Sequence, residues 1–76
     1  MKTQTLDTSG LKCPLPVLRA RKALQGLAVG DILEITATDP AAASDFPAFC
    51  AATGHRLIEQ RQDGSVWLFR IECAAR

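Results

Sequence analysis

The chain changes from a strand pattern to a helical pattern at Ser9-Gly10-Leu11-Lys12-Cys13-Pro14-Leu15-Pro16. Proline is favoured at the first position of a helix, because the N–H that it lacks would have no partner there. Pro14 also keeps the residue before it out of the α region. We therefore expect Cys13 at the N-cap of a helix that begins at Pro14, with its thiol held outward by two prolines.

This position predicts a reactive cysteine. The partial positive charge at a helix N-terminus stabilises a thiolate, which is the nucleophilic form of cysteine. The segment between Asp7 and Asp31 contains no acidic residue, whereas it contains the cations Lys12, Arg19, Arg21 and Lys22. We expect these charges to lower the pKa of Cys13, with Lys12 the best placed to do so. The alternative is a buried core cysteine, which is the usual state of a free thiol but needs neither prolines nor a helix start.

Strand and helical patterns extend outward from this stretch. Residues 3–8 are β-branched and alternating, which favours a strand that ends at Ser9-Gly10. Residues 14–27 have helical periodicity, and residues 32–37 form a second strand pattern after the Gly30-Asp31 turn. In the helix, the positions predicted to face the core are Val17, Ala20, Leu24 and Leu27, and those predicted to face water are Arg19, Lys22 and Gln25.

A second helix is predicted to begin with Asp39 as its N-cap and Pro40 in its first turn, and to end at Thr53 before Gly54. Because Pro47 falls inside this span, we expect a bend or a restart near Asp45-Phe46. The residues predicted to form its inward stripe are Phe46, Phe49, Cys50 and Thr53.

Two further strands, 55–62 and 65–73, flank Asp63-Gly64, a pair typical of a type I′ hairpin turn. In the last strand, Trp67, Phe69 and Ile71 share one face. The order is therefore βαβαββ. Right-handed crossovers then give an α+β two-layer sandwich, in which a four-stranded mixed sheet carries both helices on one face. The length favours a single domain over residues 1–76.

Composition narrows the function. The net charge of +1 favours neither nucleic acid nor an acidic partner, and no signal peptide or membrane span is recognisable. An odd number of cysteines, three, indicates a reducing cytoplasm rather than a secreted disulfide framework. No CxxC pair is present, so we expect no metal site. Cys50 is predicted to lie in the core, Cys73 to be exposed near the end of the chain, and His55 to be a surface residue rather than a catalytic base.

The motifs taken together resemble the TusA/SirA-like sulfurtransferase family. The resemblance runs from Leu6 to Ile71, and the segments that carry it are 6–16 with its CPxP motif, Arg21-Lys22, Asp39-Pro40-Ala41 and 45–50. It implies the same βαβαββ sandwich, which also occurs in the C-terminal domain of a bacterial initiation factor. It further implies a sulfur carrier whose CPxP cysteine, here Cys13, accepts sulfane sulfur as a persulfide and passes it to another protein. No cofactor is implied beyond that covalently held sulfur.

The resemblance also implies partners and roles. A sulfur-donor protein such as a cysteine desulfurase and a downstream acceptor protein are expected, without stable nucleic-acid or membrane binding. The pathway stays open between 2-thiouridine synthesis in tRNA, molybdenum-cofactor synthesis, sulfur oxidation and selenium metabolism. We expect a monomer, with a weak dimer as the alternative. The residues predicted to position the cysteine are Pro14, Pro16, Gly10 and Asp7, and those predicted to dock a partner are Lys12, Arg19, Arg21 and Lys22.

Two other classes of function compete with the sulfur carrier. A regulatory or adaptor module could bind proteins through the first helix, although such a surface has no need for the cysteine. An RNA-binding domain could share the sandwich fold, but fold analogy says little about function, and the chain lacks a basic stripe with interleaved aromatic residues.

Overall fold

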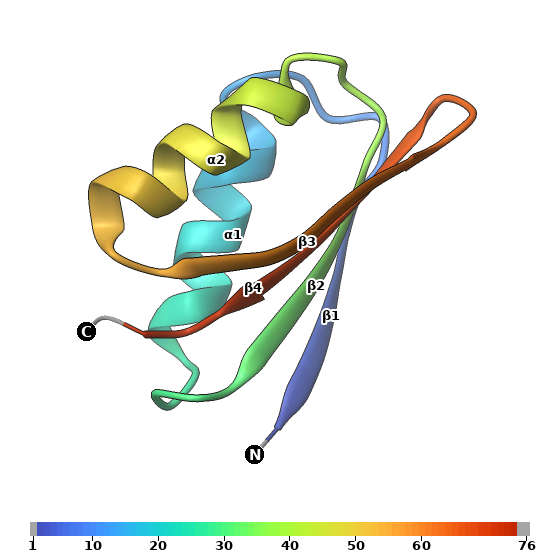
Figure 1. The fold of residues 1–76 in the computed structure, drawn as a ribbon. Helices are drawn as coiled ribbons and strands as arrows, with labels where there is room; N and C mark the ends of the chain where they lie inside the picture. The colour runs from blue at the N-terminus through green and yellow to red at the C-terminus, as the bar shows by residue number, and fades with distance from the viewer. Residues whose placement is uncertain (1, 75–76) are drawn as a thin grey trace.

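The computed structural model describes residues 2–74, and within them it places two helices against a four-stranded sheet (Figure 1). The elements follow the predicted order βαβαββ. They are β1 (Thr3–Thr8), α1 (Leu15–Gln25), β2 (Ile32–Ala37), α2 (Ala42–Thr53), β3 (Arg56–Asp63) and β4 (Val66–Glu72).

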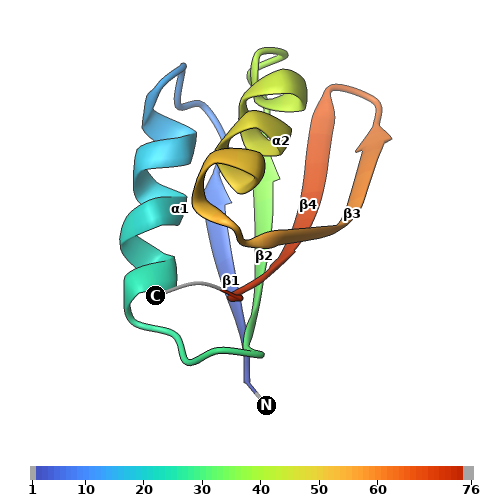
Figure 2. The same ribbon diagram turned by 60° about the vertical axis from the view of Figure 1, so that its left-hand side comes forward.

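The sheet is mixed, with strand order β1-β2-β4-β3. The edge strand β1 runs parallel to β2 from Thr3↔Ile32 to Thr8↔Ala37, whereas β4 is antiparallel to both of its neighbours. Both helices cover the same face of the sheet, as predicted (Figure 2). Because parallel strands end at the same edge, the loops that follow β1 and β2 meet at one end of the molecule.

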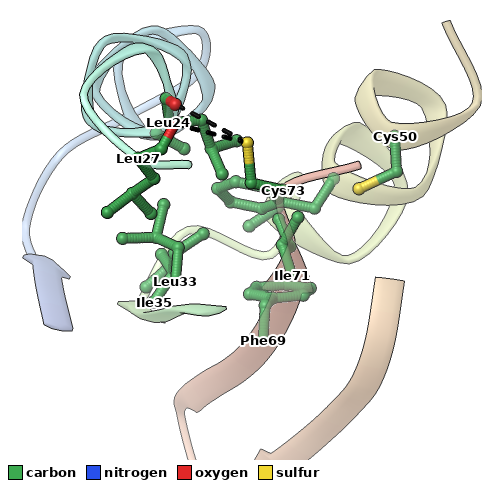
Figure 3. Packing of buried hydrophobic residues seen from close by; sticks show 12 residues of the cluster. Leu24, Leu27, Leu33, Ile35, Cys50, Phe69, Ile71 and Cys73 are labelled. Atoms are coloured by element: carbon green, nitrogen blue, oxygen red, sulfur yellow. Dashed lines mark hydrogen bonds between the residues drawn. The ribbon is translucent and has the colours of Figure 1, made fainter. Parts of the chain in front are cut away.

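The hydrophobic core lies between this sheet face and the two helices (Figure 3). The rings of Phe46 from α2 and Phe69 from β4 are packed with their centroids 4.5 Å apart. The other fully buried large side chains include Leu27, Leu33, Ile35 and Ile71. The predicted alternation in β4 is confirmed, since Phe69 and Ile71 are buried and Trp67 packs against the same cluster.

The start of α1 differs from the prediction. The N–H of Leu15 bonds to the carbonyl oxygen of Lys12 at 2.8 Å, so a turn precedes the helix and contains Cys13 and Pro14. Pro14, which follows a cis peptide bond, takes the N-cap position, and Pro16 lies within the first helical turn. Cys13, the predicted N-cap, therefore lies one residue before the observed one. The helix ends at Gln25, and Leu27 is buried in the segment after it.

The second helix begins two residues later than expected, because Asp39-Pro40 form a turn in which the N–H of Ala42 bonds to the carbonyl oxygen of Asp39. Ala41, not Asp39, is the N-cap. Of the bend or restart expected near Asp45-Phe46, the restart is wrong, since α2 is continuous. Pro47 has no N–H to offer the carbonyl oxygen of Ala43, four residues earlier, and the Gln60 side-chain amide donates to that oxygen instead, at 3.0 Å.

Two side-chain predictions in this region have opposite outcomes. Cys50 is buried in the core, as expected. Thr53 is exposed rather than inward, and its hydroxyl donates to the carbonyl oxygen of Phe49 at 2.8 Å. This local bond satisfies the threonine hydroxyl at the last turn of the helix, where the chain leaves the core.

The hairpin turn is displaced by one residue. Asp63 pairs with Val66, so Gly64 and Ser65 are the two turn residues, and only Gly64 has a positive φ, of 62°. A type I′ turn needs positive φ at both central residues, and the pattern seen here is that of type II′.

Cys73 is buried, which contradicts its predicted exposure. It continues the inward alternation of Phe69 and Ile71 past the end of β4, and its thiol lies 3.9 and 3.8 Å from the carbonyl oxygens of Leu24 and Leu27 (Figure 3). The backbone N–H of Cys73 also bonds to the carbonyl oxygen of Asp31 at 2.8 Å. The end of the described chain is therefore held against the segment that leads into β2.

Candidate functional site

Cys13 is exposed on the loop between β1 and α1, and side chains from the loop after β2 hold that loop in place. The N–H of Gly10 donates to the Thr38 hydroxyl at 2.8 Å, and the N–H of Cys13 donates to Oδ2 of Asp39 at 2.7 Å. These contacts follow from the parallel pairing of β1 and β2, which brings both loops to the upper end of the molecule in Figure 1. The position of the sulfur is thus set by two segments distant in sequence.

Asp39 connects the starts of the two helices. Its second carboxylate oxygen, Oδ1, accepts the N–H of Ala41 at 3.1 Å, so one side chain serves both loops. The bond from the Cys13 N–H, then that from Ala41 and finally the charge of Lys12 lower the pKa of Asp39, against a smaller opposing effect of desolvation. Lys12 thus acts on Asp39, and not on Cys13 as predicted. The sequence pattern predicts Asp39 as the N-cap of the second helix and does not indicate its contact with Cys13.

Asp7 and Gly10 shape the beginning of the loop. Oδ1 of Asp7 accepts the N–H of Ser9 at 2.9 Å, and hydrogen bonds from Ser9 lower the pKa of the Asp7 carboxyl. Asp7 thus contacts a backbone amide of the loop that leads to Cys13. Gly10 has a φ of 82°, in the left-handed region that favours glycine. Both residues act on the loop backbone.

A shallow pocket of about 350 Å³ lies beside the sulfur, between the start of α1 and the first turns of α2. Apolar side chains make most of its wall. The residues that line it are Cys13, Pro14, Val17, Asp45, Ala48 and Phe49. Asp45 is in the first turn of α2 and brings a carboxylate to the same pocket as the thiol. A reacting group of a partner molecule can therefore approach the sulfur over an apolar surface with one acid.

The electrostatic environment of Cys13 is the reverse of the prediction. The hydrogen bond between the thiol and Asp45 raises the pKa of Cys13 above its ordinary value, and desolvation and the charges of Asp45 and Asp39 act in the same direction. The expected lowering of this pKa by neighbouring cations is therefore wrong. In the sequence, Asp45 stands out only as part of the 45–50 segment. The signal that could have revealed its role is its place in the first turn of a helix that follows the neighbouring parallel strand.

The predicted docking cations lie elsewhere on α1. Arg19, Arg21 and Lys22 are exposed, as expected. Arg19 and Lys22 line a separate groove between α1 and β1, together with Gln4, Leu6, Ala23 and Gly26. Among the residues that the structure describes, none of these three cations lines the pocket of Cys13. Their docking role stays a prediction, while a direct effect on the sulfur receives no support from this geometry.

The other two titratable candidates, Cys50 and His55, are buried or partly buried. Burial raises the pKa of the Cys50 thiol to about 11. His55 is partly buried, its Nδ1 accepts the N–H of Ala74 at 3.3 Å, and its ring lies 6.0 Å from that of Phe49. Within residues 2–74 the structure has no cluster of His, Cys, Asp or Glu that could hold a metal ion. No helix in this range is long and apolar enough to cross a membrane.

The fold and the site define a small α+β domain that presents one exposed thiol at the edge where both helices begin. The chain belongs to the sulfurtransferase TusA family, whose model matches residues 4–73.

Individual relatives agree with this assignment. The sulfur carrier protein TusA of Allochromatium vinosum is 46% identical over 69 residues, which cover 91% of each chain. A Neisseria meningitidis protein that is provisionally named a sulfur carrier protein is 55% identical over 72 residues, covering 95% of this chain and 97% of the relative. The crystal structure of a SirA-like protein from Desulfitobacterium hafniense superposes with a TM-score of 0.79 at 26% identity, covering 97% of this chain and 99% of that one. The predicted family and fold are confirmed.

Proposed function

We propose that this chain is a sulfur carrier that accepts sulfane sulfur as a persulfide on Cys13 and passes it to an acceptor protein. The observation that carries the proposal is that Cys13 is exposed, whereas Cys50 and Cys73 are buried. Membership of the TusA family and relatives named sulfur carrier protein TusA support it. The activity is that of a sulfurtransferase acting through a single cysteine.

The chemistry needs only thiol–sulfane exchange. Sγ of Cys13 attacks the terminal sulfur of the donor persulfide, a new S–S bond forms on Cys13, and the donor's S–S bond breaks to release its thiolate. In the second step a thiolate of the acceptor attacks the terminal sulfur on Cys13, and Cys13 is the leaving group. One sulfur atom moves in each step, with no net oxidation and no resident cofactor.

We propose that protein partners dock on α1, the helix that follows the loop of Cys13. Leu15 and Leu18 are 43% and 49% exposed, although both are large apolar residues. Exposed apolar side chains of this kind mark interaction surfaces when they lie together, and these two are one helical turn apart. Arg19, Arg21 and Lys22 add positive charge to the same helix, which favours partners with an acidic rim. We assign protein docking to this combined surface.

The donor is proposed to be a protein such as a cysteine desulfurase, and the acceptor a separate protein of a sulfur-relay pathway. Synthesis of 2-thiouridine in tRNA is one such pathway, and molybdenum-cofactor synthesis, sulfur oxidation and selenium metabolism are the others. The cytoplasm is the proposed compartment, because three free thiols suit a reducing environment.

Mass spectrometry after incubation with a cysteine desulfurase and cysteine tests the proposal. We expect a gain of one sulfur atom that maps to Cys13 and that a reductant removes. The Cys13→Ser variant should gain none, since a hydroxyl cannot carry the persulfide, while the Cys50→Ala variant should still be loaded. Failure of the wild-type protein to gain sulfur from several donors would favour a non-catalytic protein-binding module.

A further inference from the structure

Asp45 is the charged group that shares the sulfur pocket. It lies in the first turn of α2 and lines the same pocket as Cys13, Pro14 and Phe49, and its interaction with the Cys13 thiol raises the pKa of that thiol. An acid in the first turn of a helix suits the helix dipole, but Asp45 also lies in a pocket whose other side chains, apart from Cys13, are apolar. A carboxylate that shares this pocket with the reacting thiol and raises its pKa acts on the chemistry of that sulfur.

The charges around the sulfur do not cancel. Asp45 faces it from α2 and Asp39 from the loop after β2. Lys12, the cation next in sequence, acts on Asp39. The cations of α1 lie along another groove, with Arg19 and Lys22 beside β1. Within residues 2–74, the charged groups that shift the pKa of the Cys13 thiol are therefore anionic, and they disfavour the thiolate.

We propose that Asp45 is a specificity-determining residue, which selects partners that present a cationic side chain next to their reacting sulfur. This inference rests on the proposed function, because it assigns the chemistry of the partner to the same site. The apolar wall of the pocket strengthens such an ion pair, since charges interact more strongly where water is displaced. A partner with a neutral or acidic group at that place meets the unpaired carboxylate instead.

The partner's cation activates the sulfur through this pair. In the free carrier, Asp45 holds Cys13 as a thiol. When a lysine or arginine of the donor pairs with Asp45, the thiol proton is released to water and Sγ becomes a thiolate. The thiolate then attacks the terminal sulfur of the donor persulfide, the donor's S–S bond breaks, and the departing donor thiolate takes a proton from water. Atoms, charge and oxidation state balance, so no further reactant is needed.

Small symmetrical disulfides that differ only in charge test this selectivity directly. Cystamine is cationic, bis(2-hydroxyethyl) disulfide is neutral and dithiodiglycolate is anionic, and each reacts with Cys13 to form a mixed disulfide and one free thiol. Rates are divided by those of N-acetylcysteine amide, which removes the intrinsic reactivity of each reagent. We expect the normalised rate to fall from the cationic to the anionic reagent by about tenfold.

Variants of Asp45 identify the origin of this preference. Asp45→Asn should reduce the ratio of the normalised rates of the cationic and anionic reagents to about twofold. It should also move the midpoint of the pH–rate profile of Cys13 to lower pH. Asp45→Glu should keep the preference for the cationic reagent. Asp63→Asn, at the exposed hairpin, is the matched control and should behave as wild type. Circular dichroism and the protection of Cys50 from labelling confirm that each variant is folded.

The outcomes separate this inference from the proposed function. If Asp45→Asn keeps the full charge preference, or wild type shows none, Asp45 does not select partners, whether or not the protein accepts sulfur. If the preference depends on Asp45 but Cys13 never gains sulfur from a donor, the selectivity stands and the sulfur-carrier proposal fails.

Discussion

The backbone N–H of Cys13 donates a 2.7 Å hydrogen bond to Oδ2 of Asp39, a residue 26 positions later in the chain. The same carboxylate accepts the N–H of Ala41 just before α2, so one side chain ties the loop of the sulfur to the start of the second helix. Asp39, which the sequence predicts as a helix cap, thus positions the reacting residue. The contact holds the loop of Cys13 in the absence of a partner.

Replacing Asp39 by alanine tests this role. The Asp39→Ala variant should slow sulfur loading of Cys13 by roughly tenfold, since small losses of alignment at a reacting centre have large kinetic effects. Hydrogen exchange at the amide of Cys13 should become faster, because its acceptor is gone. Asp63→Ala, which removes an acid at the hairpin, should change neither quantity. A variant that loads sulfur at the wild-type rate with a freely exchanging amide would show that the bond does not position the sulfur.

The three cysteines should differ in their rates of alkylation by iodoacetamide. Cys13 is exposed and should be labelled first, whereas Cys50 and Cys73 should react only after unfolding. Because the hydrogen bond to Asp45 and the other effects raise the pKa of Cys13, its thiolate fraction near pH 7 should be below that of a free cysteine. Its labelling rate should therefore rise with pH to a midpoint above that of N-acetylcysteine amide. Peptide mapping across a pH series measures this, and a midpoint below the reference would refute the assigned environment.

Reversing the charges of Arg19 and Lys22 together, as Arg19→Glu and Lys22→Glu, should slow sulfur acceptance from a protein donor by about tenfold at low salt. These exposed cations act mainly on the association rate, and screening over about 8 Å at physiological ionic strength should reduce the effect. A double reversal of Arg56 and Arg61, exposed on β3, is the matched control. A small persulfide donor should be accepted equally by all variants, and an equal loss with that donor would assign the cations to the sulfur chemistry instead.

Phe46→Ala should lower the free energy of unfolding by about 3–5 kcal/mol, because it removes a fully buried ring that packs on Phe69. Leu18→Ala changes a leucine that is 49% exposed and should have an effect within about 0.5 kcal/mol. Urea titration followed by the fluorescence of Trp67 measures both. A loss below about 1 kcal/mol for Phe46→Ala would mean that the core between α2 and β4 collapses around the gap.

Much of the fold can be predicted from the sequence. The periodicity of residues 32–37 and 65–73 predicts strands, and that of Val17, Ala20 and Leu24 predicts the inward face of α1. These patterns are local, since burial of a strand or helix face repeats with the period of that element. Element boundaries were less predictable, because the turn at Lys12–Leu15 and the turn at Asp39–Ala42 each take residues that also suit a helix start.

The sequence by itself determined the βαβαββ order, the candidate cysteine and the family resemblance, since each depends on neighbouring residues and their spacing. Only the tertiary structure decided what surrounds Cys13. Parallel pairing of β1 with β2 brings Asp39 and Asp45 to the sulfur, while it leaves Arg19 and Lys22 along a different groove. It also buries Cys73 against the carbonyl oxygens of Leu24 and Leu27. The physical reason is that the pKa and the burial of a thiol depend on distances through space, which spacing along the chain does not specify.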